Sequence, residues 1–497
     1  IDALEKVLAA QAKPRVENAS LSTNTAPATN AVQGDEKPKE SPLSFRIGGT
    51  EFTPGGFVDF ENVFRSTNTG NVTATNFWAI PYSNTAAGHL TEYRSTGQYS
   101  RLNLKISGKY GANNIVGYIE GDFNGNDATN VFVTSNPHTT RIRLYWLDLK
   151  RGKWEILGGQ TWGLQTPNRV GVSPMPGDIF GTIGEDAQVH VGVNYTRAGA
   201  FRAAYHFNDN FVWAVELQNP QQFSGQTQGA NAEVIFPAAF SGGGSNLTGQ
   251  FDNAATAGAP NVFPDIITKA AYDKDYSGRH LHFEFGGMLT SVKVTDIPTV
   301  AGATFVKHGS VGGGILAGIN AELFKNFRWL ASGLWGPGVG RYIIGMGPQA
   351  VVFPVAATSG GTCLAGAAGG CDVNISPVHA GDVITGFEMQ PWKNTLWGTY
   401  YGGAYFQRNA FPDLTAAGVT KPIIGFGGIG SNPANNKSIQ EATFDWTQTF
   451  WKNPQYGAVL MVTQTSYVTR APWFVTVGSP KNAHLMMGYL SLRYVLP

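Results

Sequence analysis

Six charged residues occupy alternate positions in three short segments of the chain. They are Arg101 and Lys105 in "SRLNLKIS", Glu120 and Asp122 in "IEGDF", and Arg141 and Arg143 in "TRIRLYW". An extended backbone would place these charges on one face and the intervening apolar side chains on the other. Since neighbouring strands lie about 4.8 Å apart, the segments would form adjacent basic, acidic and basic rows. Such rows can guide ions, and a guanidinium's two-point contact with carboxylate or phosphate favours anions.

A second interpretation of these rows stays open. Oppositely charged side chains on neighbouring strands can pair with one another and leave a solvated wall that selects no ion. Arg169 lies in the long segment "GLQTPNRVGVSPMPGDIF" and would narrow an interior passage if that segment folded inward. Asp178, Glu185 and Asp186 belong to the same region, and they would give a constriction of mixed charge.

Three further patterns in the sequence bear on other chemistry. His280, His282 and Glu284 share one face of "HLHFEF" and are plausible zinc ligands, but this spacing on a flat strand favours polar wall residues over a metal site. "GFGGIG" has the glycine spacing of a dinucleotide-binding loop, yet "SNP" follows where a helix should begin. His190 and His206 fall on the polar face without a nucleophile motif such as G-x-S-x-G. The sequence therefore predicts neither an enzyme nor a cofactor.

Composition separates this chain from ordinary soluble proteins. Its 497 residues include 63 glycines and only 14% charged residues, whereas a soluble domain typically has about 7% glycine and about 25% charged residues. The formal net charge of +1 gives no general attraction to nucleic acid. No run approaches the roughly 18 to 20 apolar residues of a transmembrane helix, so a membrane would be crossed by strands closed into a barrel.

The two cysteines and the first residue bear on the cellular compartment. Cys363 and Cys371 lie close together in "GTCLAGAAGGC", which predicts a disulfide within one loop in an oxidising environment, free thiols being the alternative. The chain starts at Ile1 rather than Met, as expected after removal of a leader. Both features favour a secreted protein.

The first 42 residues differ from the rest of the chain. Residues 1–11 place Ile1, Leu4 and Leu8 at heptad-like positions, which predicts the end of a coiled-coil helix, with a short amphipathic helix as the alternative. Residues 12–42 show no periodicity and few large apolar side chains, which predicts a flexible linker.

Residues 43–497 consist of short alternating segments separated by Gly, Asn, Pro and Ser clusters, which predicts one all-β domain. Tight linkers such as "KYGANN", "KRGK" and "FKNF" alternate with long ones. Aromatic residues flank the tight turns, as at Phe324, Trp392 and Trp451. Short turns at one rim, long loops at the other and an aromatic girdle are typical of a transmembrane antiparallel β-barrel. The predicted long loops are 66–95, 164–187, 220–264, 336–378 and 409–437.

Two local patterns affect the inside and outside of this barrel. In "TRIRLYW" the alternation places Leu144 and Trp146 on the lipid-facing side. Residues 188–207 keep one apolar parity, which predicts a single long, bulged strand with Val191 and Arg197 facing outward. The barrel then has about 16 strands, an even number, and encloses an aqueous channel rather than a packed interior.

The chain resembles the DcaP-like family of trimeric outer-membrane porins. The resemblance rests on the N-terminal heptad remnant and linker, followed in order by "FRIGGTEFTPGGFVDF", "SRLNLKISGK", "IEGDF", "RIRLYW" and "GGQTWG". It implies a homotrimer of barrels in the lipid of the bacterial outer membrane, with periplasmic N-terminal helices and passive uptake of small anionic solutes such as dicarboxylates. The cysteine-bearing loop departs from the family pattern. A sugar-specific or general diffusion porin is the alternative, ahead of an outer-membrane enzyme or an adhesin.

Overall fold

The computed structural model describes residues 41–71, 73–125, 138–175, 186, 188–225, 233–238, 250–251, 263–295, 306–344, 346–355, 373–416 and 418–497. The coiled coil predicted for residues 1–11 lies outside these ranges, as does nearly all of the linker predicted for residues 12–42. Cys363 and Cys371, with their predicted disulfide, also lie outside the described residues.

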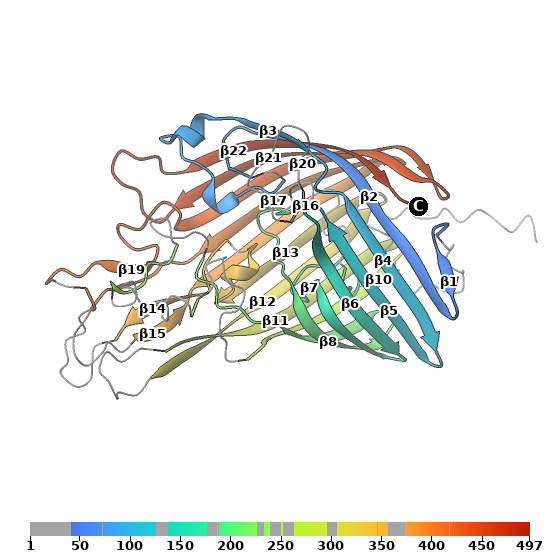
Figure 1. Ribbon diagram of the computed structural model, residues 1–497, viewed down its shortest axis with the longest axis horizontal. Helices are drawn as coiled ribbons and strands as arrows, with labels where there is room; N and C mark the ends of the chain where they lie inside the picture. The colour runs from blue at the N-terminus through green and yellow to red at the C-terminus, as the bar shows by residue number, and fades with distance from the viewer. Residues whose placement is uncertain are drawn as a thin grey trace, which may run out of the picture.

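One antiparallel sheet closes on itself to form the barrel (Figure 1). Its strands are β2 (Thr50–Arg65), β3 (Glu92–Thr96), β4 (Arg101–Tyr110), β5 (Asn113–Asp122), β6 (Arg141–Arg151), β7 (Trp154–Trp162), β8 (Arg197–Asn208), β9 (Phe211–Gln218), β10 (Asp265–Tyr276), β11 (Arg279–Thr295), β12 (Lys307–Phe324), β13 (Phe327–Pro337), β16 (His379–Trp392), β17 (Thr395–Phe406), β20 (Asn436–Asn453), β21 (Gly457–Pro472) and β22 (Ala483–Val495). β2 closes the ring because it pairs with β4 on one side and with β22 on the other.

The barrel has 16 strands, as predicted. β3 and β4 count as one interrupted strand, since they pair with successive stretches of β2. β1 (Phe45–Ile47) forms a hairpin with β2 and takes no other part in the ring. An even number places every short turn at one rim and every long loop at the other.

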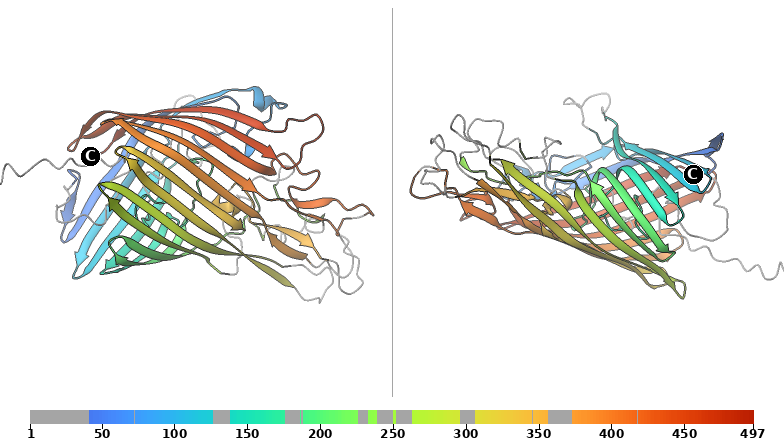
Figure 2. Two further views of the ribbon diagram at one scale, coloured as in Figure 1. Left: turned by 180° about the vertical axis from the view of Figure 1, so that it is seen from behind. Right: turned by 90° about the horizontal axis from the view of Figure 1, so that it is seen from below.

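We call the two ends of the barrel the turn rim and the loop rim. At the loop rim, β14 (Ala350–Pro354) pairs with β15 (Val373–Pro377), and β18 (Asn409–Pro412) pairs with β19 (Ile423–Phe426). Figures 1 and 2 show these hairpins gathered at one end, while the C-terminus lies at the turn rim. The predicted long loops coincide with connections at the loop rim. Short 3-10 helices lie in two of them, namely η1 (Phe77–Ala79), η2 (Ala86–His89) and η4 (Gly340–Tyr342).

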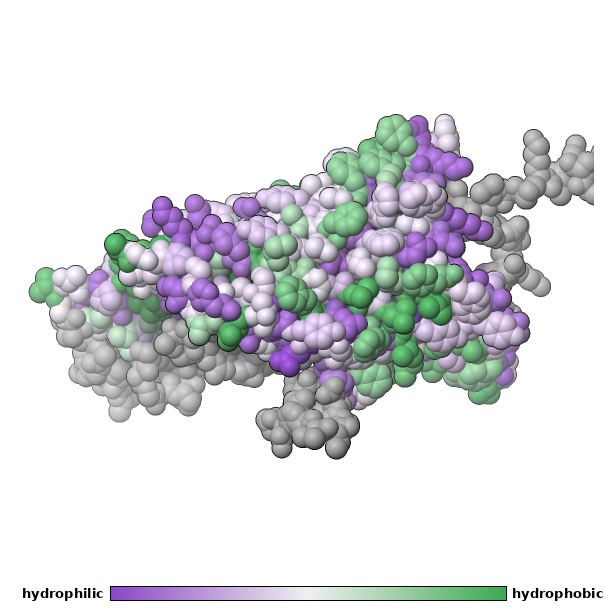
Figure 3. Space-filling view, turned by 90° about the horizontal axis from the view of Figure 1, so that it is seen from above, coloured by the Kyte–Doolittle hydropathy of each residue, from purple (hydrophilic) through white to green (hydrophobic). Residues whose placement is uncertain are grey.

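Apolar side chains cover the outside of the barrel, and charged side chains line the inside. Leu102, Ile142 and Phe444 are 55%, 59% and 50% exposed, whereas Arg143 and Asp445 are 5% and 0% exposed. Figure 3 shows patches of apolar side chains, in green, among white and purple ones on one face of the molecule. This distribution is the reverse of that in a soluble protein and suits a barrel surrounded by lipid. Among the described residues, no helix is long and apolar enough to cross a membrane.

The predicted alternation in β6 is wrong beyond Arg143. The pairing of β5 with β6 shifts register between Glu120 and Gly121, so Arg143 and Leu144 both face inward and Tyr145 faces outward. Trp146 therefore stacks on the ring of Tyr118 inside the barrel, with centroids 5.4 Å apart. A β-bulge inserts one residue into a strand and inverts the parity beyond it, which alternation alone does not reveal.

The single strand predicted for residues 188–207 is also wrong. β8 begins at Arg197, and residues 188–196 leave the wall and cross the interior, where Val191 and Val193 are fully buried. The backbone N–H of Val191 donates to the Glu441 carboxylate on β20 at 2.8 Å. Apolar parity cannot distinguish a lipid-facing strand from an extended segment buried in the lumen. The strand count is unchanged because β8 alone continues the wall.

The described parts of the β7–β8 connection, residues 163–175, Asp186 and residues 188–196, form what we call the inward segment. It passes so close to the wall that a Cβ at Gly402 on β17 would clash with the Val191 carbonyl oxygen. Replacing Gly402 by Val should push the inward segment off β17 and destabilise the protein by about 1–3 kcal/mol, the usual cost of overpacking. The expected readouts are a lower thermal midpoint and a larger single-channel conductance.

The neighbouring Gly403 provides the control. A Cβ there would meet only Gln440 Cγ and the Ile439 carbonyl oxygen, both at 3.7 Å. Gly403→Ala should therefore leave stability and conductance unchanged. Equal effects of the two substitutions would show that the inward segment does not press on Gly402.

Candidate functional site

The predicted charged rows lie side by side on the inner wall. β5 pairs with β4 and β6, and the register places Asp122 opposite both Arg101 and Arg141. Lys105 lies four residues farther along β4, opposite Tyr118. It is therefore closer to the turn rim than Arg101. The register thus brings the rows of β4, β5 and β6 next to one another on the wall.

The acidic row pairs with the β6 arginines. Arg143 donates through Nε to Glu120 Oε1 and through Nη1 to Asp122 Oδ2, both at 2.9 Å. Arg141 donates to both oxygens of Asp122, at 3.0 and 2.7 Å. Each guanidinium is thus fixed in direction by charged hydrogen bonds. For these two arginines, the interpretation of a salt-bridged wall describes the contacts correctly.

Arg101 and Arg197 are held differently. The Arg101 guanidinium lies 4.6 Å from the ring centroid of Tyr99, and that of Arg197 lies 5.3 Å from Trp162 and 5.9 Å from Tyr195. Cation–π contacts orient a guanidinium without neutralising its charge. Within the described part of the chain, neither side chain has a carboxylate partner closer than 4.0 Å.

Arg197 belongs to this group, although its parity predicted an outward position. Its guanidinium lies over the rings of Trp162 and Tyr195, which pack against buried residues inside the barrel, and this places it on the inner side of the wall. Sequence reasoning missed this position because residues 188–196 were assigned to a strand and not to the inward segment. We name Arg101, Arg141, Arg143 and Arg197 the arginine cluster; with Glu120 and Asp122 it carries an excess of two positive charges.

Carboxylates of the opposite wall hold the first half of the inward segment. The backbone N–H of Leu164 donates to Glu216 at 3.0 Å and that of Asn168 to Glu284 at 3.2 Å. Lys269 pairs with Glu284 at 2.9 Å and also donates to the Thr166 carbonyl oxygen at 2.8 Å. These acids thus do what water does for an ordinary surface loop, since each gives a backbone donor a partner.

The histidines of "HLHFEF" belong to this anchoring wall. His282 lies between Asp273 at 2.8 Å and Glu284 at 3.3 Å, while Asp273 also accepts from the Gly171 backbone at 3.0 Å. His280 contacts the carboxylates of Asp273 and Asp275. No cluster able to hold a metal ion occurs among the residues with described positions. The contacts of these histidines are those of polar wall residues. The sequence did not predict that they also hold the inward segment.

Arg169 ties the segment to β16 instead of standing free in the passage. Its Nη1 donates to Glu388 Oε2 at 2.8 Å, and its Nη2 pairs with Glu388 Oε1. The Tyr400 hydroxyl donates to the same carboxylate at 2.8 Å. All three side chains are buried. The loop predicted for residues 164–187 does fold inward where it is described, but the charge of Arg169 is used as an anchor.

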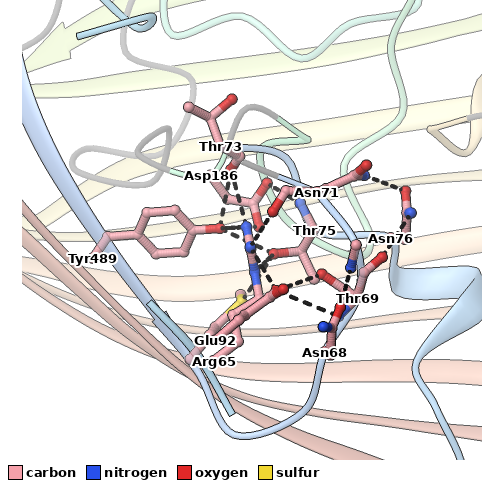
Figure 4. Close-up of polar contacts among 12 residues, drawn as sticks. Arg65, Asn68, Thr69, Asn71, Thr73, Thr75, Asn76, Glu92, Asp186 and Tyr489 are labelled. Carbon is pink, nitrogen blue, oxygen red and sulfur yellow. Dashed lines mark hydrogen bonds and ion pairs between the residues drawn. The ribbon is translucent and has the colours of Figure 1, made fainter. Parts of the chain in front are cut away.

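A polar network attaches the second half of the segment (Figure 4). Asp186 accepts from the Tyr489 hydroxyl at 2.8 Å and from the Thr75 backbone N–H at 3.0 Å. Arg65 donates to Tyr489 at 2.8 Å and pairs with Glu92 at 3.0 Å. The network joins β2, β3, β22, the β2–β3 connection and the inward segment.

His190 completes the attachment next to β20. Its Nδ1 lies 2.6 Å from the Val191 carbonyl oxygen and its Nε2 lies 2.9 Å from Thr443 Oγ1. Taken together, these anchors of the inward segment lie on β9 to β11, β16, β20 and β22 and in the β2–β3 connection. The arginine cluster lies on β4, β6 and β8, which carry none of them.

Glu388 offers a test of the anchoring to β16. Its replacement by Gln removes the carboxylate partner of the buried Arg169, and the loss of one member of a buried ion pair costs about 3–5 kcal/mol. We expect a lower thermal midpoint and a larger, noisier single-channel current. Glu51→Gln is the control, because the Glu51–Arg46 pair is largely exposed and worth at most about 1 kcal/mol. Indistinguishable variants would contradict the anchoring role.

His190 makes the attachment sensitive to acid. Burial lowers the pKa of His190 from 6.5 to about 4; Glu441 lies 3.6 Å from Nδ1, but that nitrogen is directed at the Val191 carbonyl oxygen, so desolvation prevails. A detached segment would restore the ordinary pKa. The attached state is therefore fully stabilised above pH 6.5 and loses about 3 kcal/mol as the pH falls toward 4.

The matching measurement is single-channel noise between pH 7 and pH 4. Noise should rise on acidification in the wild type and stay flat in His190→Gln. His484→Gln, at an exposed position bonded to Tyr467, should keep the wild-type response. A response that survives in His190→Gln would assign the titration to another group.

Comparison with known proteins agrees with this architecture. No family model and no curated protein matches the chain. The outer-membrane channel DcaP of Acinetobacter baumannii is similar in structure, with a TM-score of 0.59 at 14% identity over 91% of this chain and 100% of that one. The anion-selective porin of Comamonas acidovorans has a TM-score of 0.45 at 10% identity (90% and 100% covered), and Pseudomonas putida OprB has 0.45 at 9% (89% and 94% covered). The chain thus has the fold of the DcaP channel, as its sequence resemblance predicted.

Proposed function

We propose that this protein is a porin that allows small anionic solutes, such as dicarboxylates, to diffuse passively across the bacterial outer membrane. The observation that supports this proposal most directly is the pair of inner-wall guanidinium groups, Arg101 and Arg197, which lie against aromatic rings and form no ion pair within 4.0 Å among the described residues. A guanidinium that keeps its charge and its donors can contact a passing carboxylate at two points.

The rest of the arginine cluster sets how strongly an anion is held. Arg141 and Arg143 share their charge with Asp122 and Glu120, which limits the depth of the attractive site. Conduction needs binding that is favourable enough for entry and weak enough for release. A cluster with an excess of two charges, and not the four that its arginines alone would carry, meets both requirements. No covalent step is involved.

The passage lies between the arginine cluster and the inward segment in this proposal. The segment is attached to the other walls through Glu216, Glu284, Glu388, Glu441 and Tyr489, so the solute meets the arginine-bearing strands β4, β6 and β8. We place the turn rim and the N-terminus in the periplasm. The sequence resemblance also favours a homotrimer.

Reversal potentials in a planar bilayer under a salt gradient test the proposal. The wild type should give the sign of an anion-selective pore. The double variant Arg101→Gln/Arg197→Gln should reduce the anion-to-cation permeability ratio by about threefold or more, because two charges leave the narrow part of the lumen.

Lys452→Gln, at the exposed turn-rim end of β20, is the matched control and should leave the ratio unchanged. A cation-selective wild type would overturn the anion assignment. Strong retardation by sugars without ion selectivity would favour the sugar-specific alternative.

A further inference from the structure

An aromatic row runs across the outside of the barrel at the loop rim. Trp335 near the end of β13 stacks on Tyr405 near the end of β17, with ring centroids 6.1 Å apart. Tyr405 in turn contacts Trp473, the residue after β21, at 6.2 Å. Aromatic side chains on the outer face of a barrel mark the level of the lipid headgroups. The row therefore locates that level on this side of the protein.

Two cations flank the end of this row. Arg408 lies two residues beyond β17, and its guanidinium is 5.9 Å from the Trp473 ring centroid. Lys437 lies at the loop-rim end of β20, and its ammonium is 5.4 Å from the same centroid. Both side chains are exposed. The two charges converge on one ring although 28 residues separate them in the chain.

Neither cation has an acidic partner in the described part of the chain. The bulge between Asn436 and Ser438 turns Lys437 outward, while Asn436 faces inward and accepts from Arg470. Trp473 is fixed by a hydrogen bond from its Nε1 to the Phe406 carbonyl oxygen at 2.9 Å, and its backbone N–H donates to Asn435. Each of the two like charges thus lies within 6 Å of the centroid of one ring that is itself held in place.

Such an arrangement calls for a shared anion. Two neighbouring positive charges repel each other unless a counter-charge lies between them, and a phosphate monoester has enough oxygens for both. At the headgroup level of a membrane, each basic residue contributes roughly a fivefold gain in affinity for an anionic lipid. The acyl chains below the headgroup would then pack against the aromatic row.

We propose that Arg408, Lys437 and Trp473 form a binding site for the phosphate of a phosphorylated lipid headgroup in the outer leaflet. The lipid phosphate would lie between the two cations, with its acyl chains against Tyr405 and Trp335. The site is on the outside of the barrel. It depends on the loop rim facing the outer leaflet and is independent of the anion preference of the lumen.

The test measures retention of bisphosphorylated lipid A by the purified full-length protein in detergent, using native mass spectrometry. The wild type should retain the lipid, and Arg408→Gln/Lys437→Gln should bind it on the order of 30-fold more weakly, the product of two fivefold losses. Arg408→Lys/Lys437→Arg keeps both charges and should bind within about threefold of the wild type.

Controls separate the site from general charge loss and from misfolding. Lys393→Gln/Lys452→Gln removes two exposed cations at the turn rim and should bind like the wild type. All variants should keep the electrophoretic mobility of an unheated, folded barrel and the wild-type reversal potential. Equal binding by the two double Gln variants would overturn the site.

Two further arms identify the source of the phosphate. Dephosphorylated lipid A should not be retained, since it has acyl chains and no counter-charge. Inorganic phosphate at millimolar concentration should not displace the lipid. Retention of the dephosphorylated lipid, or complete displacement by inorganic phosphate, would contradict a lipid phosphate site.

Discussion

Closure of the sheet through β2 is the constraint on which the rest of the structure depends. In a lipid environment every backbone N–H and C=O group needs a partner within the protein, and only a closed ring of strands provides one for each. β2 meets this requirement by pairing with β4 at one edge and with β22 at the other. Closure also gives the sheet an outer and an inner face. The apolar side chains lie on the outer face and the charged side chains on the inner one. The lumen with its charges is therefore a consequence of satisfying the backbone.

A ring of 16 strands is too wide for wall side chains to fill, and the inward segment occupies part of the space. Backbone groups inside the lumen still need partners, and the wall supplies carboxylates at Glu216, Glu284 and Glu441. These acids are buried, so each is used as an acceptor for a backbone N–H or a basic side chain. Two side chains of the inward segment, Arg169 and Asp186, also bond to side chains of the wall. The arginine cluster lies apart from these anchors, on β4, β6 and β8.

Two physical means of holding a guanidinium coexist in that cluster. Carboxylates fix Arg141 and Arg143 and reduce their net charge, whereas aromatic rings fix Arg101 and Arg197 and leave their charge intact. The inner wall therefore presents guanidinium groups of fixed direction and a moderate excess of positive charge. Such an excess attracts an anion and still lets it leave. Outside the barrel, Arg408 and Lys437 lie against the ring of Trp473 in the same way, with no carboxylate partner among the described residues.

The sequence by itself determined the barrel, its strand number and the adjacency of the Arg101, Glu120 and Arg141 rows, because a period of two residues and the placement of turns are local properties. It could not determine the bulge at Arg143, which inverted Leu144 and Trp146, because a bulge depends on the partner strand. It also misplaced Val191 and Arg197, since lipid and a buried lumen segment demand the same apolar pattern. The pairing of Arg169 with Glu388 joins residues 219 positions apart, and only the closed barrel brings them together. Local chemistry thus fixed which face each strand shows, while closure of the ring decided what that face meets.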